Sequence, residues 1–333
     1  MSTLAATHPT LLDFKATLDP QDRVTDFIDQ LAQLNPIIQD MPMVEGNELT
    51  GYLTTVLTGI PEPTFRKLYG GVQPSKSTSV KVREGCGMLE NFAEIDKALA
   101  DLNGNSAAWR AREERIFVEG FSQKFSRYLA YGNEATEPEG FTGFAPRFNS
   151  RSALNGENII TSASPPDGSD NASMWLIGWS DTKVHGIYPK GSKAGLQISD
   201  KGEVTVENVD GAGGRMQAYR THFRWDVGLC VRDWRYVSRV QVDAEDLVKD
   251  AATGPDLFDL IAQAEEMIPS LDACRPIWYA NRTMRTWLRR QATNKIKNST
   301  LTYEMLAGKP VMQINGIPVK RWDALTNTEA AVS

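Results

Sequence analysis

Cysteine and histidine are scarce in this chain, and that scarcity excludes several kinds of site. The 333 residues include three cysteines and three histidines. Cys86, Cys230 and Cys274 form no C-x-x-C pair and are odd in number, so neither a disulfide framework nor a zinc ribbon is indicated. We interpret them as small core residues. The histidines lack the H-x-x-H spacing that places two metal ligands on one helix face.

Long apolar runs and an excess of basic residues are also missing. No uninterrupted apolar stretch reaches the roughly 18 residues of a membrane span, and residues 1–20 lack the pattern of a signal peptide, so we expect synthesis in the cytosol. The net charge of -6 argues against a protein that wraps tightly around nucleic acid, although it permits loose contact with DNA. With 41% hydrophobic and 23% charged residues, the chain is typical of a soluble globular protein with one large domain or two lobes sharing a core.

Catalytic motifs are not apparent either. Met216 replaces the last glycine of a dinucleotide fingerprint in the segment 211–216, Gly191 lacks the upstream glycine of a P-loop, and Ser180 lies outside a G-x-S-x-G motif. We assign no catalytic residue, no metal ligand and no cofactor. Acidic pairs and eight tryptophans leave a carbohydrate-active enzyme as an alternative, which would need two carboxylates at catalytic separation. Core packing is the simpler role for Trp175 and Trp225.

The first 84 residues predict two segments that cannot bury their apolar groups alone. Asp19 to Leu34 predicts an amphipathic helix, begun by an Asp-Pro pair and ended by Pro36, with one apolar stripe that includes Phe27 and Leu31. Residues 44–84 are punctuated by glycine and proline and hold two strand-like runs, 52–58 and 79–83. They predict a long two-stranded loop that rests on another surface, in this subunit or in a neighbour.

The middle of the chain predicts helices followed by strands. Residues 87–102 and 105–131 read as helices, and the second carries an apolar stripe through Phe117, Phe121 and Phe125. Met174–Trp179 reads as a strand buried on both faces, and a hairpin signal at 210–214 precedes a long alternating strand. The alternation changes parity after residues 232–233, which predicts a bulge or break there.

The last ninety residues predict helices and then short strands. Pro255 restarts a helix within an acidic stretch, 243–266. Residues 275–297, which we also read as helical, carry seven bases and no acid. This basic run could touch phosphates, but we favour pairing with the acidic run, in cis or in a neighbouring copy, because the chain is acidic overall. Two strands, 309–314 and 317–319, are joined by Asn315-Gly316.

Three stretches, with the arm, the loop and the long helix, carry a resemblance to a known family. They are GIYPKGSKAGL at 186–196, QAYRTHFRWDVGL at 217–229 and VRDWRY at 231–236. Together they resemble the major capsid proteins of tailed phages with the Hong Kong 97 type fold, and most closely those of short-tailed phages of the epsilon fifteen type. The resemblance spans roughly Asp13 to Leu325.

The resemblance implies an α+β fold and a structural role. We expect an N-terminal arm (1–43), an extended β-hairpin loop (44–84), a peripheral lobe with the spine helix and long antiparallel strands (85–150 and 200–243), and an axial α/β lobe (151–199 and 244–333). Copies would assemble through hexamers and pentamers into the icosahedral head around double-stranded DNA, in the host cytoplasm. Scaffold, portal and cementing proteins are implied as partners, and a tail or other virion component is the alternative that would form rings or tubes.

We predict subunit contacts in the arm, the loop and the basic run. Some family members crosslink lysine and asparagine side chains, but no partner for Lys76 or Lys81 matches that pattern, so this chemistry is not carried over. Lys295 and Lys297 are the candidates for facing DNA. The candidate contact residues are Phe27, Leu31, Arg66, Lys67, Tyr69, Lys76, Arg282, Arg285, Arg289 and Arg290.

Overall fold

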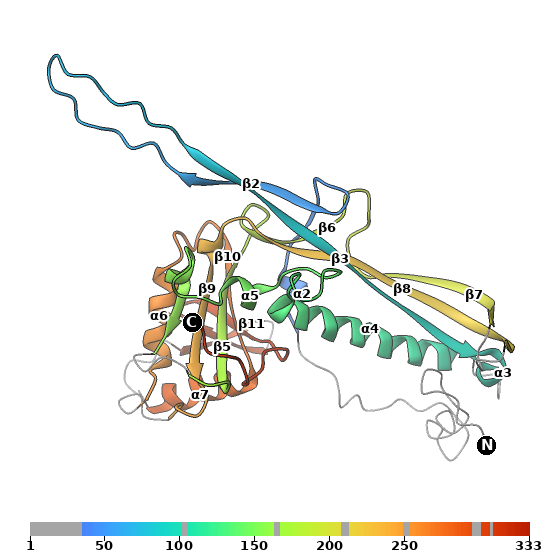
Figure 1. Cartoon of the computed structure of the whole chain (residues 1–333). Coiled ribbons are helices and arrows are strands. Elements are labelled where there is room, and N and C mark those ends of the chain that lie inside the picture. Colours follow the sequence, from blue (N-terminus) through green and yellow to red (C-terminus); the bar gives the residue numbers. More distant parts are fainter. Residues whose placement is uncertain are drawn as a thin grey trace.

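The computed structural model describes residues 35–101, 106–162, 167–207, 213–248, 254–294, 301–306 and 309–333. The predicted arm helix, Asp19 to Leu34, lies outside these residues. The described chain has an elongated part, a compact lobe and a long hairpin that projects beyond both (Figure 1).

The strands form one sheet in the described part of the chain. Its main path runs β11-β12-β13-β10-β5-β6-β8-β3-β2, while β1, β4, β7 and β9 pair off this path. The strands are β1 (Met43–Glu45), β2 (Gly51–Gly59), β3 (Thr78–Asp96), β4 (Ile159–Thr161), β5 (Asn171–Trp179), β6 (Val184–Tyr188), β7 (Gln197–Glu207), β8 (Arg215–Val231), β9 (Val237–Asp243), β10 (Arg275–Ala280), β11 (Leu301–Leu306), β12 (Lys309–Ile314) and β13 (Ile317–Arg321).

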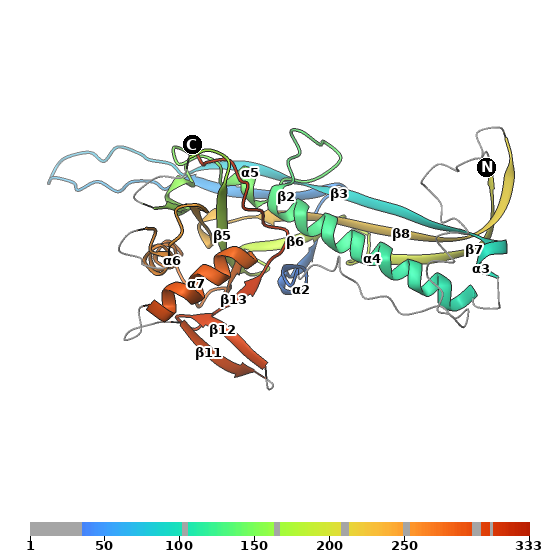
Figure 2. The same ribbon diagram turned by 90° about the horizontal axis from the view of Figure 1, so that it is seen from below.

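Helices cover the sheet in both regions (Figure 2). The long one follows β3, β7 and β8, and two others lie on the compact lobe. The helices are α2 (Ile37–Asp40), α3 (Lys97–Ala100), α4 (Ser106–Tyr131), α5 (Phe144–Arg147), α6 (Leu257–Glu266) and α7 (Arg282–Asn294), with 3-10 turns η2 (Gly156–Asn158) and η3 (Trp234–Tyr236).

The long helix predicted at 105–131 is confirmed as α4. Its stripe packs on the sheet: Phe121, Phe125 and Leu129 are buried, and the ring of Phe117 stacks on Phe223 of β8 with centroids 5.6 Å apart. Apolar residues recurring every three or four positions place one face of a helix on a core, which is why this pattern was informative.

The predicted helix at 87–102 is wrong. Residues 87–96 continue β3, and only Lys97–Ala100 is helical. β3 pairs antiparallel with β8 without interruption from Cys86↔Gly228 to Asp96↔Ala218. This ladder satisfies backbone groups over eleven residue pairs with a strand more than a hundred residues away, so tertiary pairing overrides a local pattern that fits either structure.

The predicted break after β8 is confirmed. β8 ends at Val231, the 3-10 turn η3 follows, and β9 begins at Val237. The Asp233 side chain accepts a hydrogen bond from the Arg235 amide at 3.2 Å and caps the turn. β9 then runs antiparallel to β5, so the change of parity marks the point where the chain leaves the long strands for the compact lobe.

The compact lobe is built around β5, which is buried along its whole length as predicted. β9 and β10 flank it, and α6 begins at the predicted place, where the Asp256 side chain accepts hydrogen bonds from the amides of Phe258 and Asp259. The expectation of helix from Arg275 is wrong, because residues 275–280 are the strand β10. Alternating burial cannot be recognised there, since Ile277–Ala280 are all buried.

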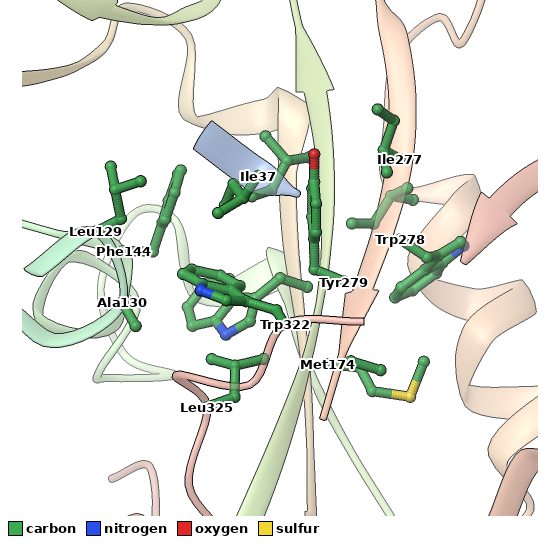
Figure 3. Packing of buried hydrophobic residues seen from close by; sticks show 14 of the residues in the cluster. Ile37, Leu129, Ala130, Phe144, Met174, Ile277, Trp278, Tyr279, Trp322 and Leu325 are labelled. Carbon is green, nitrogen blue, oxygen red and sulfur yellow. The ribbon is translucent and has the colours of Figure 1, made fainter. Parts of the chain in front are cut away.

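Large aromatic side chains join the lobe to the elongated part (Figure 3). Trp322 lies among Leu129 of α4, Phe144 of α5 and Tyr279 of β10, and its indole nitrogen donates a 2.6 Å hydrogen bond to Ser126 of α4. Trp175 and Trp225 are buried, which confirms the prediction of core packing.

A buried ion pair holds the C-terminal residues against the same junction. The guanidinium of Arg239 in β9 lies 2.7 Å from a carboxylate oxygen of Glu329, and both side chains are almost fully buried. The Tyr131 hydroxyl at the end of α4 donates a 2.6 Å bond to the other oxygen of Glu329. Burial, with the neighbouring carboxylate, raises the pKa of Tyr131, so this hydroxyl remains a donor. The C-terminal segment around Glu329 therefore links α4 to β5 and β9.

The predicted turn at Asn315-Gly316 is confirmed between β12 and β13. Asn315 has φ 51° and Gly316 φ 81°. Two successive positive φ values define the type I′ turn that asparagine and glycine favour in tight hairpins.

Candidate assembly interface

The segment 44–84 folds as the predicted two-stranded hairpin. β2 and β3 pair antiparallel from Gly51↔Gly85 to Gly59↔Thr78, and the hairpin extends well away from the rest of the chain (Figure 1). Both predicted strand-like runs, 52–58 and 79–83, lie in this ladder. Its outer part rests on no other element within the described part of the subunit.

The hairpin ends in a tip, residues 60–77, whose large apolar side chains face solvent. Phe65, Leu68 and Tyr69 are each at least 88% exposed. The few hydrogen bonds of the tip are internal, such as that from the Gly70 amide to the Lys67 carbonyl at 3.1 Å. A monomer that exposes such a group leaves an apolar surface of the kind that marks an interaction site. Four predicted contact residues lie here: Arg66, Lys67, Tyr69 and Lys76.

The root of the hairpin is fixed by buried polar contacts that the sequence did not indicate. Glu84 of β3 accepts two 2.6 Å hydrogen bonds from the guanidinium of Arg147 in α5. A Cβ atom on Gly51 would lie 2.1 Å from the carbonyl oxygen of Glu84, so only glycine fits there. This bidentate pair ties the emerging hairpin to the body and sets the direction in which the tip projects.

A buried histidine lies beside this root. The ring of His185 in β6 packs edge-on against Tyr52 of β2, and its Nδ1 lies 3.2 Å from the Gly186 carbonyl. Burial lowers the pKa of His185, so the ring is neutral at neutral pH. It fills the space under the hairpin as a packing residue.

The second predicted contact set lies on α7. Arg282 forms an ion pair with Asp323 at 3.1 Å, beyond the acidic stretch that we expected as its partner. Arg289 and Arg290 are exposed, and the guanidinium of Arg290 lies 4.6 Å from the centroid of the Trp287 ring. Arg285 is half-buried on the same helix.

The structure does not bring the two sets together. The tip lies at the far end of the hairpin, and α7 lies on the compact lobe (Figure 1). Phe27, Leu31, Lys295 and Lys297 lie outside the described residues.

The remaining reactive groups form no catalytic cluster in the part of the chain that is described. Burial raises the pKa of the thiol to about 12 in Cys86 and to about 11 in Cys230, so neither is a thiolate nucleophile near neutral pH. No group of three or more metal-ligating side chains occurs among the described residues. None of the described helices combines the length and apolarity that a membrane span requires.

Known proteins resemble this chain in sequence and in structure. The family model of Major capsid protein GP7 matches residues 19–333. A chain from the structure of bacteriophage Epsilon15 superposes with a TM-score of 0.80 at 36% identity, covering 100% of this chain and 99% of that chain. The capsid chain of a native GTA particle gives 0.46 at 10% identity, covering 68% and 96%, and the procapsid chain of bacteriophage JBD30 gives 0.42 at 11%, covering 78% and 84%. No curated protein matches.

The family match and the superposition over the whole chain identify this fold as that of a coat protein that assembles with copies of itself. The chain belongs to the Major capsid protein GP7 family. It is the major capsid protein of a tailed phage, a structural protein of the virion that forms the icosahedral head. The predicted fold class and function are therefore confirmed.

Proposed function

We propose that the hairpin completes the shell by lying over an adjacent subunit. The observation that carries this proposal is the exposure of the tip, where Phe65 and Tyr69 have no packing partner among the described residues of their own chain. A two-stranded hairpin is marginal in water by itself. A stable interface removes about 1,600 Å² in total from solvent, and a neighbouring copy is the surface available for that burial in a shell.

We propose further that the copies form hexamers and pentamers, with the compact lobe as the axial lobe (151–199 and 244–333) and the elongated part as the peripheral lobe (85–150 and 200–243). The pairing of β9 with β5 supports assigning residues 237–243 to the axial lobe instead. The exposed arginines of α7 support contacts between axial lobes. We retain Phe27 and Leu31 as contacts of the arm.

Double-stranded DNA, scaffold, portal and cementing proteins complete the proposed partners. The net charge of -6 supports weak, non-specific contact with DNA rather than a tight complex, and Lys295 and Lys297 are the proposed DNA-facing residues. Raising the salt concentration should then lower only slightly the part of the shell's stability that depends on enclosed DNA.

Electron microscopy of the full chain, expressed alone and with a scaffold, tests the proposal. We expect closed shells assembled from rings of six and five copies. Open tubes or rings would support a tail component, and solitary compact molecules at high concentration would contradict the proposal.

A further inference from the structure

The hairpin joins the body at a pivot in β3. This strand runs without interruption over Thr78–Asp96, but it changes its partner on the way. Gly85 still pairs with Gly51 of β2. The next residue, Cys86, pairs with Gly228 of β8. The sheet therefore passes from the body to the hairpin through a single strand, and side-chain contacts across this step help to hold the hairpin in the direction shown in Figure 1.

Two side-chain contacts cross the pivot at the same level. Tyr52 and Glu84 lie directly opposite each other in the ladder of β2 and β3, so their side chains share one face. Glu84 is held by the guanidinium of Arg147 in α5. Tyr52 packs edge-on against His185 of β6, with ring centroids 5.7 Å apart. The hairpin is thus fixed to α5 through β3 and to β6 through β2.

The ring of His185 has no place for a second proton. It is fully buried, and its Nδ1 lies 3.2 Å from the Gly186 carbonyl, so this nitrogen carries the proton of the neutral ring. The other nitrogen, Nε2, is also buried, and it has no hydrogen-bond partner in the described part of the chain. A second proton would therefore create a buried donor without an acceptor, together with a buried positive charge.

The charged groups around the ring do not compensate that charge. Arg232, which follows β8, places its guanidinium carbon 5.7 Å from the centroid of the Tyr52 ring, so a cation already lies close to this contact. The carboxylate of Glu84 is engaged by its own guanidinium partner. Asp181, in the turn before β6, is exposed, and water screens its attraction for the ring.

The strands on either side of β6 add no charge at this level. Cys230 of β8 lies opposite His185, and burial raises the pKa of its thiol to about 11, so it is neutral. On the other side, β1 begins with Met43 opposite Gly186. A protonated ring would therefore be surrounded by neutral groups and one repelling cation.

The pH dependence has a definite sign. Burial lowers the pKa of His185 from its ordinary value of 6.5, and the nearby Arg232 lowers it further. Moving Tyr52 away uncovers the ring and restores the ordinary pKa, so the open hairpin binds a proton that the closed hairpin excludes. The stability of the closed pivot is therefore complete above about pH 6.5 and is lost as the pH falls toward the lowered pKa.

We infer that His185 is an acid-sensitive lock at the pivot of the hairpin. The neutral ring packs against Tyr52 and holds the hairpin in its projecting direction, and protonation of the ring releases it. The pair between Glu84 and Arg147 is unaffected, so the released hairpin changes its direction but stays attached and folded.

Hydrogen exchange of the full-length chain tests the lock. The readout is the exchange rate of amides at the pivot, in peptides spanning 44–52 and 83–89, corrected for the pH dependence of the chemical step. We expect the corrected rate to rise between pH 7 and pH 5.5 by up to about eightfold, the limit for a closed ring that stays unprotonated. A peptide from α6, 257–266, reports global unfolding and should change by less than about twofold. A rise below about twofold at the pivot, or an equal rise in α6, would overturn the inference.

Substitution of the imidazole assigns the response to one residue. His185→Phe keeps an aromatic edge against Tyr52 but cannot be protonated, so its corrected rate should not change with pH. His185→Asn, whose amide can donate to the Gly186 carbonyl, takes its place if the phenylalanine variant does not fold. The matched control, His8→Gln with His222→Gln, removes the other two histidines and should keep the full response. A response that persists without the His185 imidazole, or that is lost in the control, would overturn the inference.

The consequence for shells rests on the proposed placement of the hairpin over an adjacent subunit. Shells assembled at pH 7.5 are titrated with urea at that pH and at pH 5.5, and closed particles are counted by electron microscopy. We expect the urea concentration that opens half of the shells to fall more on acidification for the unmodified chain than for His185→Phe. Equal acid responses of the two proteins would overturn the inference, whereas absence of shells at pH 7.5 would contradict the proposed function instead.

Discussion

Deletion of Pro61–Ser77 is expected to leave a folded subunit that forms no shells. The deleted residues contribute none of the buried core, and the ladder from Gly51↔Gly85 to Gly59↔Thr78 is retained. An Asn-Gly pair inserted before Thr78 closes the shortened hairpin with a favourable turn. In the proposed assembly the tip supplies the apolar contact with a neighbour, so its removal eliminates that contact from every copy.

The measurement compares thermal unfolding of the subunit with particle counts by electron microscopy. We expect an unchanged melting temperature and complete loss of closed shells. The control is a full-length chain with Glu62→Gln, which alters the tip but keeps its apolar residues. It should form shells at the normal yield. Shells of normal yield from the shortened chain would contradict the prediction.

The second large effect concerns the buried pair between Arg239 and Glu329. Besides this ion pair, Arg239 donates a 2.6 Å hydrogen bond to the Phe148 carbonyl. Replacing it with methionine leaves the Glu329 carboxylate buried without its countercharge. Loss of one partner of a buried pair costs about 3–5 kcal/mol, so Arg239→Met should lower the free energy of unfolding by that amount.

Urea unfolding of isolated subunits measures this loss. The variant Arg239→Met with Glu329→Gln removes both charges and should be more stable than Arg239→Met alone, because the uncompensated charge is gone. A change below about 1 kcal/mol in Arg239→Met would contradict the account of the tail as a fixed tie between α4 and the compact lobe.

The sequence predicted elements whose signals are local. The stripe of α4 gave a long helix, the apolar run of β5 a buried strand, and Asn315-Gly316 a tight turn, since each depends on residues a few positions apart. The change in the parity of apolar residues near Asp233 correctly predicted a break in the long strand. These elements reflect periodicity and turn chemistry that act before any tertiary contact is made.

Elements that depend on distant partners were missed. Residues 87–96 form a strand because β8 lies beside them, and the pattern of 87–102 alone did not distinguish this from a helix. Residues 275–280 are buried on both faces, so they carried no alternation. In each case the deciding contact is made with a segment remote in sequence.

The interface was predictable only in part. The composition of 44–84 identified the hairpin, because a coreless loop rich in glycine and proline has few other structures available. The Glu84–Arg147 pair at the root is a product of the packing of α5 against β3. No spacing along the chain encodes it.

Completion of one copy by another through the hairpin is the central claim, and a cryo-electron microscopy reconstruction of the assembled shell tests it most directly. The account predicts continuous density between residues 60–77 of one copy and the surface of its neighbour, with Phe65 and Tyr69 buried. A hairpin whose tip stands free in solvent, or folds back on its own subunit, would contradict it.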